Sequence, residues 1–298
     1  MSAVYWFARG GSNLAKWTPR PLRERLGYAI GTSSYLAWRS KRQVTLLNMA
    51  QVAGKPVNDP RVQYLAYASW RNYGRYAADF MNFANMAAED IESSVLDVTE
   101  GASCWQTYLE QAKQAGRGII FVSAHFGNWD MAGAILARYI TFSAIAETFT
   151  DGRLNTLLQN QRKEKGIAII PLEGSPRRIL RTLQQNQVVG LLVDRPVTQQ
   201  QGTPIRFFGR TTYVPGGTAA LALKSGAAIL PGYVWYGPRN QMLLRAFPPI
   251  FPQSSGDRDS DIATVTQRIY DSLEEMVRAW PTQWYMFRQF WPTEGIDA

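Results

Sequence analysis

From about Thr99 onward, short apolar runs alternate with segments of helical spacing, and few folds accept that pattern. Strands that are apolar along their whole length are buried on both faces, as in a parallel sheet covered by helices. The sequence therefore predicts an α/β fold with a largely parallel central sheet flanked by helices. The expected strands are 118–124, 142–147, 167–172, 188–193 and 228–235, with 241–247 as an edge pair. The expected helices are 131–139, 154–165, 176–185, 217–224 and 261–279, the third capped by Ser175 before Pro176.

The first 95 residues have a helical pattern instead. Segment 21–38 places Leu22, Leu26 and Ile30 four residues apart, and 62–81 is a second amphipathic segment. We therefore divide the chain into a helical N-terminal region, 1–95, and an α/β domain, 96–298, which together form one compact unit.

The net charge lies entirely near the N-terminus. Residues 1–80 hold twelve Lys and Arg against three acidic residues, which equals the formal charge of +9 of the whole chain. Such asymmetry indicates an anionic partner, either a lipid surface or nucleic acid, although a merely solvated basic face has the same composition. Aromatic rings in the same segment favour the lipid, because such rings suit the headgroup boundary. They are Tyr5, Trp6, Phe7, Trp17, Tyr28, Tyr35 and Trp38.

Segment 21–38 has the character of a helix that lies in a membrane interface, although a helix packed in the core has the same spacing. No run reaches the ~20 apolar residues that cross a bilayer, and no cleaved signal peptide is expected. A single cysteine, Cys104, is typical of a reducing compartment. We therefore expect residues 1–95 to dock peripherally on an anionic membrane, on the cytoplasmic face of the cell membrane, and expect no nucleic-acid partner.

His125 is the only histidine and directly follows the expected strand 118–124. One histidine and one cysteine exclude a His-rich zinc or iron site and a thiolate cluster, so no metal is expected. Open α/β sheets place their ligands at the carboxyl ends of parallel strands, which is where His125 falls. The residue is therefore the first candidate for chemistry.

The residues after His125 indicate a sharp turn into a helix. Gly127 permits the turn, Asn128 is a good helix cap, and Asp130 falls in the first helical turn. A carboxylate folded back onto the imidazole fixes its tautomer and frees the other nitrogen to accept a hydroxyl proton. We predict that His125 is a general base with Asp130 as its partner. A buried structural histidine that caps the turn is the alternative.

Other chemistries lack their motifs. The chain has no Gly-x-Ser-x-Gly elbow, no phosphate loop and no dinucleotide-binding glycine motif. A lipid hydrolase would need a serine beside His125, and strand alternation turns Ser123 away. A non-catalytic basic module that binds anionic membrane or nucleic acid is the remaining alternative, and its binding would not depend on His125.

The segment HFGNWD, 125–130, resembles the His-x-x-x-x-Asp signature of the glycerolipid (lysophospholipid) acyltransferase superfamily. From about residue 41 to the end, the chain is similar to its bacterial branch, the lipid A late acyltransferases and the phosphatidylinositol mannoside acyltransferases. The further matches, in order along the chain, are Glu147, Arg162 in QRKEKG, Asp194-Arg195-Pro196, Phe207-Phe208-Gly209-Arg210, Val214-Pro215-Gly216 and the aromatic segment 281–288.

The resemblance implies transfer of a fatty acyl group from acyl-CoA or an acyl carrier protein to a hydroxyl of a membrane lipid or glycolipid, without a further cofactor. The lipid A enzymes usually carry an N-terminal membrane span, which is not seen here, so the acceptor need not be lipid A. Besides the catalytic pair, the candidate substrate-binding residues are Arg162, Asp194, Glu147, Asn128 and Arg195.

Arg162 and Asp194 have two interpretations. Asp194 ends a buried strand at the same sheet edge as His125, so both can line one pocket. Arg162 either pairs with Asp194 as scaffold or binds a phosphate of the acceptor or the thioester donor, since guanidinium geometry suits both roles.

Overall fold

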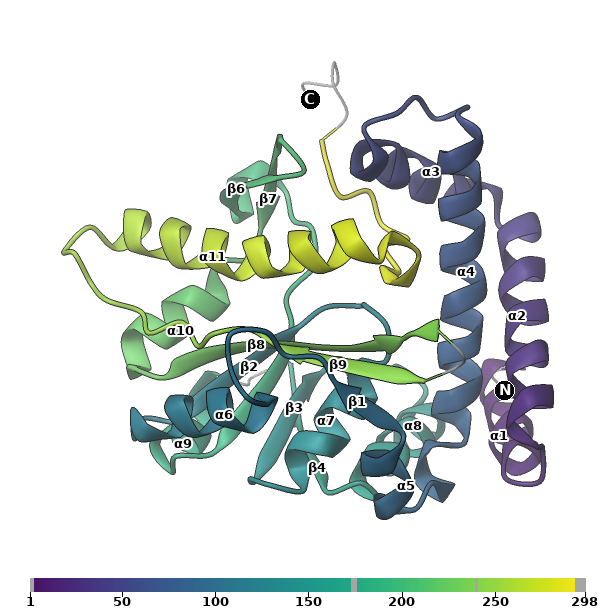
Figure 1. Cartoon of the computed structure of the whole chain (residues 1–298), viewed down its shortest axis with the longest axis horizontal. Coiled ribbons are helices and arrows are strands. Elements are labelled where there is room, and N and C mark those ends of the chain that lie inside the picture. Colours follow the sequence, from purple (N-terminus) through teal and green to yellow (C-terminus); the bar gives the residue numbers. More distant parts are fainter. Residues whose placement is uncertain (1–2, 173–175, 239–240, 293–298) are drawn as a thin grey trace.

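The computed structural model describes residues 3–172, 176–238 and 241–292 (Figure 1). A seven-stranded sheet with the order β1-β9-β8-β2-β5-β3-β4 forms its centre. Neighbouring strands are parallel except β8 and β9, which are antiparallel. The predicted α/β fold with a largely parallel sheet is confirmed. The strands are β1 (Val95–Asp97), β2 (Ile119–Ser123), β3 (Phe142–Ala146), β4 (Ile167–Pro171), β5 (Val188–Leu192), β8 (Ala228–Tyr236) and β9 (Met242–Ala246).

Helices cover both faces of the sheet, and a buried hydrophobic cluster lies between the helices and the sheet on each face. Alternate residues of β2 belong to the two clusters. Ile120 and Val122 pack toward α9 (Pro176–Gln184), α10 (Gly217–Ser225) and α11 (Arg258–Ala279). Ile119 and Phe121 pack toward α6 (Trp105–Gln114), α7 (Trp129–Ala137) and α8 (Gly152–Lys163). Figure 1 shows α11 and α7 on opposite sides of the sheet. β2 is therefore buried on both faces, as its continuous apolar sequence predicts.

The N-terminal region consists of helices, and its four long ones pack against one end of the α/β layers, at the right of Figure 1. The helices are α1 (Ala3–Ala15), α2 (Arg20–Ala37), α3 (Arg39–Ala53), α4 (Pro60–Met81) and the short α5 (Ala88–Ser93). Leu65 and Trp70 of α4 belong to the same buried cluster as Ile120 of β2, so this region and the sheet share a core. The boundary at residue 95 stays a prediction.

One face of α2 is seated tightly on α4. A Cβ added at Gly74 would lie 2.1 Å from the carbonyl oxygen of Gly27, so the two backbones are in direct contact. Leu22, Leu26 and Ile30 lie on the other face and are 50%, 51% and 45% exposed. The alternative that this stripe is core is therefore wrong. In the described ranges, no helix has the length and apolarity to cross a bilayer.

The sequence pattern does not predict four elements: β1, α6 and the antiparallel hairpin of β6 (Thr203–Phe207) and β7 (Arg210–Val214). β1 has only three residues, which are too few to show the two-residue alternation of a strand. Pro204 weakens the strand signal of β6. The edge position predicted for 241–247 is wrong, because β1 pairs with the outer side of β9. α9 begins at Pro176 as predicted, whereas its expected cap, Ser175, lies outside the described residues.

Candidate active site

His125 lies beside Asp194 because their two strands are neighbours in register. β2 and β5 are parallel partners in which Ser123 is level with Leu192, and each functional residue stands two positions further along. His125 Nδ1 lies 2.8 Å from Asp194 Oδ1, and the His125 backbone N–H lies 3.0 Å from both carboxylate oxygens. The imidazole is thus anchored from the neighbouring strand.

Asp194 is fully buried and holds its charge through these contacts. Trp284 Nε1 donates to Asp194 Oδ2 at 3.0 Å, from the segment after α11. Phe126 and Trp284 also form an isolated backbone bridge. Burial alone would raise the pKa of Asp194, but the imidazole and the hydrogen bonds from His125 and Trp284 together hold this pKa below its ordinary value. The carboxylate is therefore an ionised acceptor.

The free edge of the imidazole is accessible. The His125 side chain is 40% exposed, whereas its partner carboxylate is completely buried. Because an ionised carboxylate only accepts hydrogen bonds, this contact assigns the proton to Nδ1 and leaves the lone pair on Nε2. Trp129 packs against the ring at 5.3 Å between centroids. The arrangement suits a general base that accepts a proton from a bound hydroxyl.

Asp130 occupies the first turn of α7 as predicted, but its carboxylate does not contact His125. It accepts hydrogen bonds from Tyr76 Oη of α4 and from Arg162 Nε of α8, both at 2.6 Å. The predicted His125–Asp130 contact is wrong, and so is the alternative in which Arg162 pairs with Asp194. Instead, Asp194 contacts His125 and Asp130 contacts Arg162. The reason is that the turn into α7 directs Asp130 toward α4 and α8, away from the edge where β5 ends.

The contacts of the Arg162–Asp130 pair are those of a buried structural ion pair. The two side chains are 17% and 4% exposed. Arg162 Nη1 donates to Gln159 Oε1 at 3.2 Å, and the guanidinium carbon lies 5.1 Å from the Phe80 ring centroid. Burial, and secondly the charge of Asp130, raise the pKa of Tyr76 well above its ordinary value, so its hydroxyl remains a donor.

Of the other candidate residues, Glu147 and Arg195 are partly exposed, whereas Asn128 is buried. Glu147 and Arg195 form an ion pair with side chains 51% and 34% exposed. The hydrogen bond from Arg195 lowers the pKa of Glu147, and the charge of Arg288 acts in the same direction. Asn128 is buried and caps α7 as predicted, because its Oδ1 accepts from the Met131 N–H at 3.1 Å. Glu147 and Arg195 remain accessible to substrate, whereas the Asn128 amide is used inside the protein.

Sequence reasoning missed the part played by the C-terminal segment. The Gly127 N–H donates to the Gln283 carbonyl, and the Tyr285 N–H donates to the His125 carbonyl, each at 2.8 Å. With Trp284 on Asp194, three successive residues hold the turn at His125 and the acid that contacts its imidazole. The available signal was the match of 281–288 to the acyltransferase pattern, which carries no role for single residues. Across the described part of the chain, no three His, Cys, Asp or Glu side chains form a potential metal site.

Comparison with known proteins shows the family of this chain. The bacterial lipid A biosynthesis acyltransferases match residues 1–293. The chain belongs to this family. The protein is therefore an acyltransferase, and the alternative of a non-catalytic basic module is set aside.

Similar proteins come from mycobacteria. The phosphatidylinositol mannoside acyltransferase of Mycobacterium tuberculosis is 31% identical over 252 residues, which cover 82% of this chain and 75% of the relative. The enzyme of the same name from Mycolicibacterium smegmatis is 30% identical over 255 residues, covering 84% and 79%.

Replacing the two acids separately in this family member distinguishes their roles. Asp194→Asn should lower kcat by about 10²-fold, because a neutral amide neither fixes the Nδ1–H tautomer nor stabilises an imidazolium. Asp130→Asn should chiefly lower the melting temperature and leave kcat of the folded enzyme within about tenfold. Steady-state kinetics beside thermal melts would check both. Unchanged kcat in Asp194→Asn would remove that residue from the catalytic pair.

Proposed function

We propose that this acyltransferase moves a fatty acyl group from an acyl thioester to a hydroxyl of a membrane glycolipid of the phosphatidylinositol mannoside kind. The observation that carries the chemistry is the His125–Asp194 pair, whose imidazole is partly exposed at the carboxyl edge of the sheet. The names of the mycobacterial relatives support the choice of acceptor.

The proposed reaction takes one step without an acyl-enzyme. His125 Nε2 accepts the proton of the acceptor hydroxyl while the hydroxyl oxygen attacks the thioester carbonyl carbon. The new ester C–O bond forms, the C–S bond breaks, and the proton passes from the imidazolium to the departing thiolate. Asp194 keeps the ring oriented and stabilises its positive charge during the transfer.

Direct attack by the acceptor is favoured over a serine nucleophile. Ser123 Oγ is buried and has no hydrogen-bond partner among the described residues. Because Ser123 is therefore not hydrogen-bonded to His125, this supports acyl transfer to a bound alcohol rather than lipid hydrolysis through Ser123.

A product assay tests the proposal. Purified protein would be incubated with labelled long-chain acyl-CoA or acyl carrier protein, together with a phosphatidylinositol mannoside, a lipid A precursor, a lysophospholipid or no acceptor. We expect an acylated phosphatidylinositol mannoside and one thiol released for each ester, resolved by mass. Transfer only to another acceptor contradicts the proposed substrate. Free fatty acid without any ester indicates a hydrolase.

The proposal includes peripheral docking through residues 1–45, on the cytoplasmic face where acyl thioesters are made. The large apolar side chains exposed on and beside α1 and α2 support it. They are Val4, Trp6, Phe7, Leu14, Trp17, Leu22, Leu26, Ile30, Leu36 and Trp38. Exposed basic residues in the same segment, including Lys16 and Arg25, complement an anionic headgroup layer.

Vesicle co-sedimentation tests the docking. Binding should rise with anionic lipid content and fall with salt, and each of Lys16→Glu and Arg25→Glu should weaken it by about fivefold or more. Trp17→Ser should weaken it in any lipid, whereas Phe251→Ser, a control 46% exposed outside the docking helices, should not. Equal binding to neutral vesicles in high salt would leave only the apolar contribution.

A further inference from the structure

The buried end of β8 carries a tyrosine whose hydroxyl joins two parts of the molecule. Tyr236 Oη donates to Asp79 Oδ2 at 2.9 Å and receives a hydrogen bond from Asn128 Nδ2 at 3.3 Å. The Arg75 guanidinium carbon lies 3.9 Å from the centroid of the tyrosine ring. Burial, and secondly the charge of Asp79, raise the pKa of Tyr236 well above its ordinary value, so the hydroxyl keeps its proton.

On one side, this hydroxyl reaches the turn that carries His125. The Asn128 backbone N–H donates to the Val234 carbonyl of β8 at 2.7 Å. Gly127 has a φ of +57°, and a Cβ there would lie 2.2 Å from the same carbonyl oxygen, so the turn is pressed onto the strand end. The Tyr236 hydroxyl adds the side-chain contact that fixes the Asn128 amide, the cap of α7.

On the other side, the chain of contacts continues into α2. Asp79 Oδ1 lies 3.5 Å from Arg23 Nε, in an ion pair whose side chains are 8% and 13% exposed. Arg23 Nη1 also donates to the Thr18 carbonyl, in the link between α1 and α2, at 3.1 Å. Four side chains therefore connect the α2 helix with the turn after His125: Arg23, Asp79, Tyr236 and Asn128.

We propose that Tyr236 is a positioning residue for the His125 turn, and that Asp79 and Arg23 hold its hydroxyl, so α2 is part of the support of the catalytic turn. The inference rests on the proposed function of His125 as base. A displacement of about 1 Å between reacting groups can cost about 10²-fold in rate, so a loosened turn acts on turnover rather than on substrate binding.

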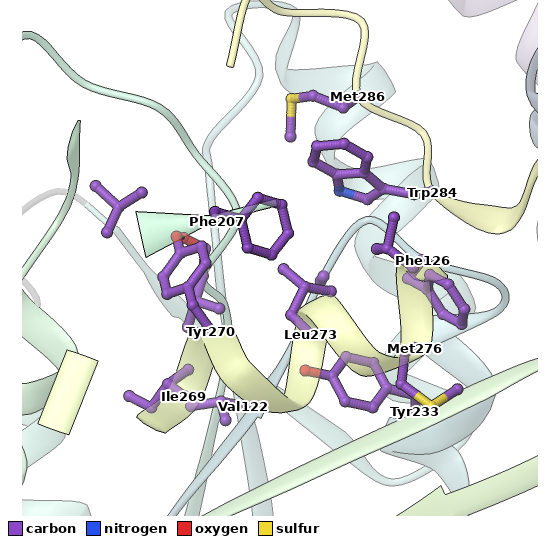
Figure 2. Packing of buried hydrophobic residues seen from close by; sticks show 14 of the residues in the cluster. Val122, Phe126, Phe207, Tyr233, Ile269, Tyr270, Leu273, Met276, Trp284 and Met286 are labelled. Atoms are coloured by element: carbon purple, nitrogen blue, oxygen red, sulfur yellow. The ribbon is translucent and has the colours of Figure 1, made fainter. Parts of the chain in front are cut away.

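Tyr236→Phe tests the proposal, with Tyr233→Phe as the matched control. Tyr233 lies on the same strand, is equally buried, and its hydroxyl contacts Ser272 Oγ of α11 at 3.2 Å (Figure 2). Both variants lose one buried hydroxyl, but Tyr236→Phe also removes the donor to the Asp79 carboxylate and should melt earlier, so kcat is compared at a temperature where both variants are fully folded. With long-chain acyl-CoA and a detergent-dispersed phosphatidylinositol mannoside, Tyr236→Phe should lower kcat about tenfold with KM within about twofold. Tyr233→Phe should keep the wild-type kcat.

Wild-type kcat in Tyr236→Phe, or an equal loss in both tyrosine variants, overturns the positioning role. The turnover of His125→Ala, measured in the same assay, separates failure of the proposed function from failure of the positioning role. If that variant keeps its turnover, the proposed function itself fails. If it loses turnover while Tyr236→Phe does not, only the positioning role fails.

The contribution of α2 is tested by a double-mutant cycle. Arg23→Gln should lower kcat about threefold when Tyr236 is present and should add nothing in the Tyr236→Phe background, because coupled residues are non-additive. Detergent-dispersed acceptor keeps membrane docking out of the measured rate. An unchanged kcat in Arg23→Gln, or the same loss in both backgrounds, removes α2 from the support.

Discussion

His125→Ala is expected to lower kcat by about three orders of magnitude, since base catalysis typically supplies about 10²–10⁴-fold and no second histidine can replace the ring. The protein should still fold. The lost side chain is 40% exposed, and the buried Asp194 carboxylate keeps the His125 backbone N–H and Trp284 Nε1 as donors. Initial rates of acyl transfer, measured on protein with an unchanged circular dichroism spectrum, give the comparison.

Chemical rescue sharpens this experiment. Added imidazole should restore part of the turnover in His125→Ala, because the vacated space lies between the solvent and a carboxylate that remains in place. The same imidazole should not raise the rate of Asp194→Asn, which keeps its own ring. Near-normal turnover of His125→Ala without imidazole would show that the mechanism is wrong.

The sequence identifies the sheet and the candidate base because both have local signals. The central strands β2, β5 and β8 are largely continuous apolar runs, and burial between two helical layers explains why their residues do not alternate. His125 is found from its place at the end of one such strand. The turn at Gly127 and the cap at Asn128 follow equally local rules of φ angle and hydrogen bonding.

The partner of His125 is not a local property. Asp130 is five residues away, and this short spacing favours it, whereas Asp194 is sixty-nine residues away and meets the imidazole because β2 pairs with β5. Placing both strands in one parallel sheet is insufficient, since the strand order must also be known. Trp284 is ninety residues from Asp194 and belongs to no strand of the sheet, so sequence spacing carries no signal for their contact.

The buried Arg162–Asp130 pair should give the largest effect on stability. Removing one partner strands the other charge in a site where the side chains are 17% and 4% exposed, so Arg162→Ala and Asp130→Ala should each cost about 3–5 kcal/mol of unfolding free energy. The double variant should recover part of that loss, because neither charge is then left unpaired. Chemical denaturation of the four proteins completes the cycle.

The unfolding free energy and KM of the Arg162 variants together distinguish a structural ion pair from a substrate contact. Lys113→Ala removes a surface ion pair with Glu110 at 2.8 Å, and this control should cost less than about 1 kcal/mol. Arg162→Lys should recover little stability, because a point charge does not reproduce the guanidinium fork that reaches both Asp130 oxygens, Oδ1 through Nε at 2.6 Å and Oδ2 through Nη2 at 3.4 Å.

If Arg162 instead binds a substrate phosphate, Arg162→Ala would unfold like the wild type and raise KM for one substrate alone. The contacts with Asp130, Gln159 and Phe80 occupy the guanidinium within the protein, so we expect the stability loss and an almost unchanged KM.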